Sequence, residues 1–281
     1  MKPLSSPPLW YRILGYGILF LGAVLFFGPI LFMLIASLKP DHLVLSEAGS
    51  WRAFFPSEAS LDNYRSVFTR VSFVRFLLNS LFITGTIVAA GLVVNSLAGY
   101  AFARLPWKGR HLFFLLVLAL LILPFEAIAA PLFYQMTEMG WRNSYQVQII
   151  PFIANAFSIY LFYTFFLGLP RELEESAMMD GAGPWRTYWQ VIVPTAKPAF
   201  ASVAILTFLL HWGNYLWPLM VTVGDTYRPL PVAIASFQTL PPIQWGDIMA
   251  FGVMMVAPVM VVFLWFQRWF VQGVAASGMK N

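Results

Sequence analysis

The sequence predicts an all-α membrane protein with six transmembrane helices. Of its 281 residues, 59% are hydrophobic and only 10% are charged, whereas ordinary soluble domains contain about 25% charged residues. A helix that crosses a bilayer needs about 20 predominantly apolar residues. Six segments meet that requirement, at residues 12–38, 76–103, 112–135, 148–168, 199–223 and 248–267.

The first apolar segment could also be read as a secretory signal. Lys2 and Arg12 precede it, and the small residues of "IAS" lie near its end. A cleaved signal has an apolar core of about 7 to 15 residues, and the core of this segment is longer. We therefore favour a retained transmembrane helix.

The loop "RLPWKGRH", residues 104–111, predicts the orientation. It is short and basic and contains no acidic residue, and Lys and Arg concentrate in the cytoplasmic loops of membrane proteins. With six spans, both termini then lie in the cytoplasm together with residues 169–198.

The net charge of +5 is explained by this topology, so we infer no nucleic-acid partner. The lack of cysteine excludes disulfides and thiolate metal sites, and we expect no metal site.

Four small or polar residues recur at four-residue intervals in the second span. They are Gly91, Asn95, Gly99 and Ala103. On a helix they share one face, and small residues there let another helix approach closely in lipid. We favour a packing seam over a stripe that lines a solute pathway.

The third span is interrupted by Pro124 and Pro131, with Glu126 between them. Because proline ends or kinks a helix, we expect the regular helix to stop near residue 124. Glu126 is then either a functional carboxylate or a cap for a neighbouring helix.

The fifth span carries a polar stripe. His211, Asn214, Tyr215 and Pro218 have the spacing of one helical face, and lipid cannot satisfy such a stripe. Hydrogen bonding between helices and the lining of a translocation pathway both remain open as explanations.

The sequence contains no motif of an enzyme. It has no GxxxxGK[ST] loop, no HExxH and no GxSxG. We expect no catalytic residue, and any energy for transport would come from a partner or from an ion gradient.

Residues 169–198, "LPRELEESAMMDGAGPWRTYWQVIVPTAKP", are unusually polar and predict two short helices. Pro170 suits the first helical position, Glu172 and Glu174 favour the positive end of the helix dipole, and Gly181 can take the left-handed conformation that ends the helix. This first helix either docks into a soluble partner or is a solvated connector.

The second short helix carries an aromatic stripe. Trp185, Tyr188, Trp189 and Ile192 share one face, and Pro194 is expected to stop the helix. The pattern is typical of a helix that lies in the lipid headgroup layer, so we expect an anchor at the membrane surface.

The same stretch, "EESAMMDGAGPWRTYWQVIVP", resembles the EAA loop of permease subunits of ABC importers. Glu175, Ala177, Gly181, Ile192 and Pro194 match its pattern, whereas Ser176 and Val193 replace the usual Ala and Leu. The segments "LLNSLFIT", "LPFEAIAAPLF", "HWGNYLWPL" and "QRWFVQGVAASGMKN" are similar to the second permease subunit of maltose-type carbohydrate importers.

The resemblance implies a six-helix, type I importer permease fold (MetI-like) in a bacterial or archaeal cytoplasmic (inner) membrane. The expected parts are a first helix and external loop at 1–75, a five-helix permease core at 76–271 with the EAA loop at about 169–198, and a cytoplasmic tail at 272–281. The implied partners are a second permease subunit, an ABC ATPase dimer that holds ATP and Mg, and a periplasmic or lipid-anchored solute-binding protein. This chain itself would carry no cofactor.

The resemblance also assigns residues. Those expected to dock into the ATPase are Glu174, Glu175, Ser176, Ala177, Met178, Met179, Asp180, Gly181 and Ala182. Tail contacts to the ATPase are expected at Gly273, Ser277 and Gly278. Candidate residues that line the pathway are His211, Asn214, Trp217 and Glu126.

The expected function is ATP-driven import of a sugar or polyol by alternating access. A polyol phosphate such as glycerol 3-phosphate is the alternative solute, although a phosphate favours Arg or Lys in its pathway and the cores of these spans contain none. The alternative class is a stand-alone secondary transporter, which would usually show internal repeats and intramembrane charges.

Overall fold

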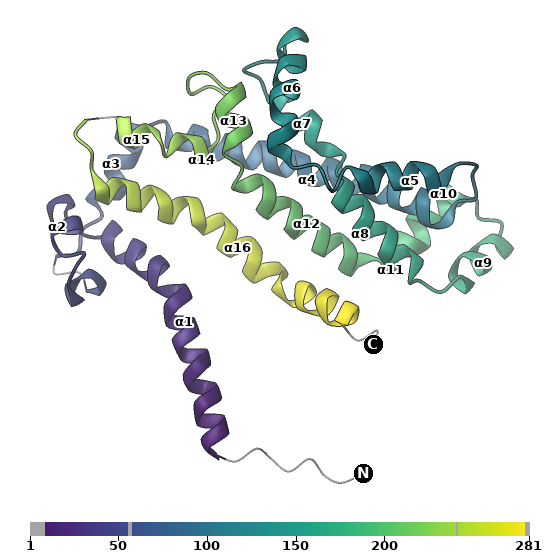
Figure 1. Ribbon diagram of the computed structural model, residues 1–281, viewed down its shortest axis with the longest axis horizontal. Coiled ribbons are helices and arrows are strands. Elements are labelled where there is room, and N and C mark those ends of the chain that lie inside the picture. Colours follow the sequence, from purple (N-terminus) through teal and green to yellow (C-terminus); the bar gives the residue numbers. More distant parts are fainter. Residues whose placement is uncertain (1–8, 56–57, 240, 279–281) are drawn as a thin grey trace. The chain divides into compact units, whose positions relative to one another are not determined.

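The computed structural model describes residues 9–55, 58–239 and 241–278, with side chains up to residue 266. All regular structure in these residues is helical, as predicted (Figure 1). The chain divides into two compact units, Met1–Ser72 with Ile234–Val256, and Phe73–Ala233 with Ala257–Asn281. The expected functional division at residues 75 and 271 stays a prediction.

The first unit contains a long apolar helix and several short ones. Its elements are α1 (Leu9–Ser37), α2 (Asp41–Ser46), the 3₁₀ turn η1 (Trp51–Phe54), α3 (Asp62–Arg70), α15 (Ser236–Thr239) and the start of α16 (Trp245–Gly278). Helix α3 lies between the first two apolar segments of the sequence.

Buried ion pairs hold the first unit together. Lys39 Nζ donates to Glu47 Oε2 at 2.9 Å, and Arg70 Nη1 donates to Asp247 Oδ2 at 2.8 Å. Asn63 adds two hydrogen bonds, to the carbonyls of Ser37 and Lys39. Because charges without partners are costly in such surroundings, these pairs fix the path of the connecting segment.

The second unit is built around α4 (Phe73–Arg104). The other elements are α5 (Arg110–Ala119), α6 (Phe125–Glu138), α7 (Tyr145–Ile153), α8 (Ala156–Leu167), α9 (Glu172–Met179), α10 (Pro184–Thr187), the π-helical turn η2 (Tyr188–Ile192), α11 (Val193–Thr195), α12 (Lys197–Trp212), α13 (Leu216–Val221) and α14 (Leu230–Ala233). Helices α7, α8 and α12 all pack against α4.

Four helical segments in the described residues are long and apolar enough to cross a membrane. They are Leu9–Ser37, Phe73–Arg104, Tyr145–Leu167 and Trp245–Phe266. A fifth is present if Pro184–Thr195 and Lys197–Trp212, which meet at a bend of 78°, form one span.

Three predicted spans are not continuous helices. The fourth, predicted at 148–168, breaks between α7 (Tyr145–Ile153) and α8 (Ala156–Leu167). The third breaks as expected, but α5 already ends at Ala119, before Pro124. The prediction of one helix over 199–223 is wrong, because α12 ends at Trp212 and α13 begins at Leu216. The interruption begins at Gly213. Glycine in a helix interior is less stable than alanine by about 1 kcal/mol.

The small-residue face of α4 is a packing seam, as predicted. A Cβ atom built on Gly99 would lie 2.6 Å from Phe162 Cβ and 3.0 Å from Tyr163 N, and one built on Gly91 would lie 3.2 Å from Ile153 O. These distances leave no space for a methyl group at Gly99. The absence of a side chain there permits the close contact between α4 and α8.

Gly99→Ala tests this seam. We expect the substitution to destabilise the chain by about 1–3 kcal/mol, the usual cost of overpacking, which offsets the higher helix propensity of alanine. Gly85→Ala is the matched control, because Gly85 lies on the same helix with nothing within 4 Å of its built Cβ. Thermal unfolding in detergent should show a lower midpoint for Gly99→Ala alone, and equal midpoints would contradict the seam.

Candidate functional site

Helix α9 ends in a glycine turn that reverses the chain. Gly181 has a φ of +76°, which confirms the predicted left-handed residue. Its N–H donates to Met178 O at 3.0 Å, and the N–H of Ala182 donates to Ala177 O at 2.9 Å. These are the two hydrogen bonds of a Schellman motif. Since nothing lies within 4 Å of a Cβ built on Gly181, backbone conformation is what favours glycine there.

The two faces of α9 have different surroundings. Its inner face consists of Leu173, Glu174 and Ala177, of which Ala177 is buried and the other two are partly buried. The remaining predicted docking residues in the helix and its turn are exposed, except for partly buried Ala182, and Met179 is 84% exposed. The outer face is formed by Glu175, Ser176, Met178, Met179 and Asp180.

Glu174 points toward the interior of the same chain, where it meets Arg104. Arg104 Nη1 donates to Glu174 Oε2 at 3.3 Å, and the two side chains are 5% and 12% exposed. Arg104 also donates to the carbonyls of Phe166 and Leu169. Sequence reasoning used Arg104 only to predict orientation, because no local pattern links it to a residue 70 positions away.

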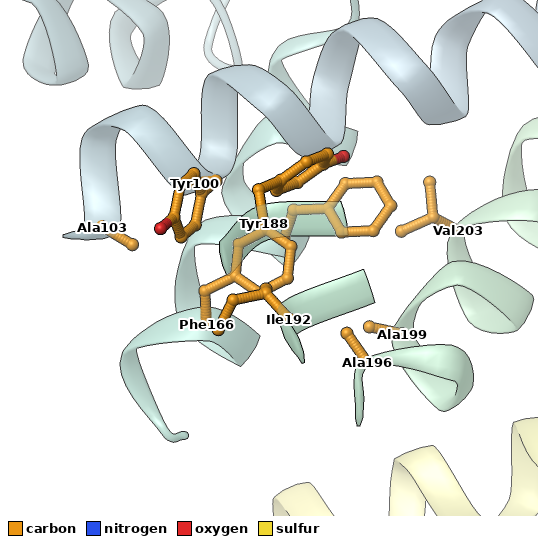
Figure 2. Packing of buried hydrophobic residues seen from close by; sticks show 9 residues of the cluster. Tyr100, Ala103, Phe166, Tyr188, Ile192, Ala196, Ala199 and Val203 are labelled. Carbon is orange, nitrogen blue, oxygen red and sulfur yellow. The ribbon is translucent and has the colours of Figure 1, made fainter. Parts of the chain in front are cut away.

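The predicted anchor helix instead packs into the protein. Tyr188 and Ile192 are fully buried in a cluster with Tyr100 and Phe166, and Figure 2 shows these side chains gathered together. The Tyr188 hydroxyl lies 2.6 Å from Ser96 Oγ of α4. The interpretation of the whole stripe as a headgroup anchor is therefore wrong for these two residues.

The outer part of the stripe does remain exposed. Trp185 and Trp189 are 64% and 42% exposed. The helix ends at Thr195, one residue after Pro194, close to its predicted end, but residues 188–192 within it form a π turn. A π turn accommodates an extra residue in a helix, and the sequence pattern gave no sign of it.

Three of the candidate pathway residues line one small cavity in the second unit. His211, Asn214 and Trp217 surround it together with residues of α4 and α7, in a volume of about 20 Å³. The lining residues with polar side chains are Ser80, Thr84, Gln148, His211, Asn214 and Trp217. A space of that size holds one water molecule and is far below the roughly 300–1,000 Å³ of ordinary ligand pockets.

The polar groups around this cavity are only partly satisfied. Trp217 is fully buried and its Nε1 donates to Val147 O at 2.9 Å. Gln148 Oε1 and His211 Nε2, in contrast, are buried without a hydrogen-bond partner among the described residues. The cavity is thus a polar site within an apolar unit.

The other predicted site residues lie elsewhere. Glu126 is exposed in the first turn of α6 and does not line the cavity. Gly273, Ser277 and Gly278 fall in the last part of α16, where side chains lie outside the described residues. The structure therefore leaves the roles predicted for these four residues as predictions.

Relatives of the chain are transport permeases. The chain is 34% identical to the arabinooligosaccharides transport system permease protein AraQ of Halalkalibacterium halodurans, with 100% of both chains covered. It is 31% identical to the trehalose/maltose transport system permease protein MalG of Thermococcus litoralis, over 92% of this chain and 93% of that one. It is also 34% identical to the sn-glycerol-3-phosphate transport system permease protein UgpE of Yersinia pestis, over 72% of each.

Similarity to solved structures and to a family model agrees with these relatives. A chain from the crystal structure of a bacterial ABC transporter involved in the import of the acidic polysaccharide alginate matches with a TM-score of 0.84 at 24% identity, over 96% of this chain and 100% of that chain. This likeness shows the shared fold. A family model matches residues 91–276, more than half of the sequence. The chain therefore belongs to the family of binding-protein-dependent transport system inner membrane components.

Proposed function

We propose that the chain is a transmembrane permease subunit of an ATP-driven importer that moves a sugar or polyol across the cytoplasmic membrane. The observation that carries this proposal is the outer face of α9, which is exposed, acidic and mounted on a well-packed base. Relatives named for arabinooligosaccharides and for trehalose and maltose support the solute class.

The outer face of α9 has the properties of a docking surface. Glu175 and Asp180 offer exposed carboxylates, and Met178 and Met179 offer flexible apolar side chains that adapt to a moving partner. The Schellman turn at Gly181 sets the end of the helix. We assign this face to a groove of the partner ATPase, and residues near Gly273 and Ser277 to a second contact.

The complete importer contains parts that this chain lacks. A second permease subunit completes the pathway, an ABC ATPase dimer binds ATP and Mg, and a periplasmic or lipid-anchored solute-binding protein delivers the solute. The chain contributes no catalytic residue and no cofactor. Its termini and α9 face the cytoplasm, and its core at 76–271 forms one half of the pathway.

The mechanism is a shift between inward-facing and outward-facing states. ATP closes the ATPase dimer, and the closure moves the docked α9. Moving such an equilibrium from 1:99 to 99:1 requires about 10⁴-fold tighter binding of ATP to one state, or about 5.5 kcal/mol. If α9 were loosely attached, its movement would not be passed to the membrane helices. The hydrogen bond of buried Tyr188 and the contacts of Arg104 connect the segment firmly to α4.

The solute is an uncharged sugar or polyol in this proposal. The cores of the apolar spans contain neither Arg nor Lys, and a phosphate would favour such a residue. The similarity to a glycerol 3-phosphate permease keeps a polyol phosphate as the second candidate.

Gly181→Asp tests the docking turn. We expect the importer still to assemble in the membrane, while transport and solute-stimulated ATP hydrolysis fall to background. The reason is that aspartate strains the left-handed turn and adds a negative charge to the docked surface. Gly140→Asp is the matched control, since Gly140 has a similar φ of +69° and nothing within 4 Å of its built Cβ. Full stimulated hydrolysis in Gly181→Asp would refute the assignment.

Glu175→Arg tests the charge of the same face. Reversing this exposed carboxylate should weaken co-purification with the ATPase and abolish stimulated hydrolysis, since a docked carboxylate would be replaced by a cation. Glu138→Arg makes the same change at an exposed position at the end of α6 and should leave hydrolysis unchanged. Equal effects of the two substitutions would contradict a specific docking contact.

The solute can be identified with the solute-binding protein encoded beside this chain. We expect neutral oligosaccharides or polyols to raise its thermal unfolding midpoint, and glycerol 3-phosphate to have no effect. Stabilisation by the phosphate alone would overturn the neutral-solute proposal.

Transport by this chain in vesicles without any ATPase would instead indicate a secondary transporter.

A further inference from the structure

Arg104 joins three helices through one side chain. It is the last residue of α4, it donates to two carbonyls at the C-terminal end of α8, and it pairs with Glu174 in the first turn of α9. The Nε to Phe166 O distance is 2.9 Å. With its side chain only 5% exposed, Arg104 lies at the junction between the helical core and the proposed docking helix.

The chemistry of this junction requires arginine. The last carbonyls of a helix lack partners within the helix and lie at the negative end of its dipole, so a cation from α4 is favourable there. The guanidinium group presents five donors in a rigid fork, which lets it contact both carbonyls and the carboxylate at once. A lysine ammonium has no such planar geometry.

Glu174 is poorly explained as a purely stabilising residue. Its Oε2 lies at 3.3 Å from Arg104, and the Tyr100 hydroxyl of α4 also interacts with the carboxylate. Its Oε1 is buried without a hydrogen bond of ordinary geometry among the described residues. A carboxylate that is only partly satisfied costs free energy, and such groups in native structures call for an explanation in terms of function.

Helix α9 follows α8 in the chain and is joined to it by residues 168–171. The main packing neighbours of α9 are α10 and η2, and η2 in turn contacts α4 through Tyr188 and Ser96. Besides the backbone link at residues 168–171, the Arg104–Glu174 ion pair connects α9 to the end of α4 and, through the carbonyls to which Arg104 donates, to the end of α8.

We propose that Arg104 is a positioning residue that transmits movement of α9 to α4 and α8 through its pair with Glu174. This inference rests on the proposed function, in which α9 docks into an ATPase. It assigns Glu174 to coupling within the chain, and leaves docking to the exposed outer face. Movement of α9 is then passed to α4 and α8.

The test uses the complete importer in lipid nanodiscs. Glu174→Leu removes the acceptor and leaves the two carbonyl contacts of Arg104 in place. We expect the ATPase to co-purify as with the wild type, and solute transported per ATP hydrolysed to fall at least about fivefold, the lower end of ordinary coupling effects. Glu172→Leu, an exposed acid in the same first turn, is the control and should behave like the wild type.

Two further variants separate coupling from stability. Glu174→Gln retains a neutral acceptor and should give an intermediate loss of coupling, since charge-assisted hydrogen bonds are roughly twice as strong as neutral ones. Arg104→Lys keeps the charge and should still reduce coupling. A lower unfolding midpoint with unchanged transport per ATP in these variants would show a merely structural pair and overturn the inference.

A distance measurement follows the movement itself. The chain contains no cysteine, so spin labels can be placed at Arg171→Cys, before α9, and at Val94→Cys, an exposed position on α4. Addition of ATP should leave the distance between the labels unchanged in the wild type and change it in Glu174→Leu. An equal ATP response in both would refute the inference, whereas failure of the wild-type chain to bind any ATPase would refute the proposed function instead.

Discussion

Lipid cannot hydrogen-bond to a peptide group, so every interruption of a membrane helix needs a partner inside the protein. In the second unit α4 supplies these partners. Asn95 donates to Ile153 O and accepts from Asn155 N, which satisfies the break between α7 and α8. Asn79 donates to the carbonyls of Thr226 and Arg228, and Ser80 Oγ accepts from Leu230 N.

This arrangement makes α4 both the packing centre and the source of polar contacts for its neighbours. Ser96 holds Tyr188, and Arg104 holds the end of α8. The candidate docking segment and the membrane helices thus depend on polar side chains of one continuous helix. A broken helix elsewhere in the unit is tolerated because α4 itself is unbroken over Phe73–Arg104.

The sequence was sufficient wherever the relevant physics is local. Apolar length predicted the long helices α1, α4 and α16. Glycine spacing predicted the seam at Gly99, and the glycine after a carboxylate-rich stretch predicted the left-handed turn at Gly181. Each of these depends on a few neighbouring residues or on one regular period. The resemblance to the EAA loop likewise rests on a contiguous motif, and the family membership agrees with it.

What the sequence could not show depends on residues that are distant along the chain. A stripe that contains Tyr188 and Ile192 suits a membrane surface or a protein core equally well. For these two residues the hydroxyl of Ser96 and the Tyr100 ring favour the core. The inward direction of Glu174 depends in the same way on Arg104. His211 and Asn214 were predicted on one helical face, yet the cavity that they line also depends on Ser80 and Gln148 from other helices.

The contact at Gly99 has a consequence for conformational change. With Phe162 Cβ, Tyr163 N and Ile159 O all within 3.2 Å of a built Cβ, neither helix has a smooth surface at this point. Longitudinal sliding of α8 along α4 would drive the Phe162 side chain into the next turn of α4, where Tyr100 and Ala103 carry side chains. This close contact favours movement of α4 and α8 together in the proposed transport cycle.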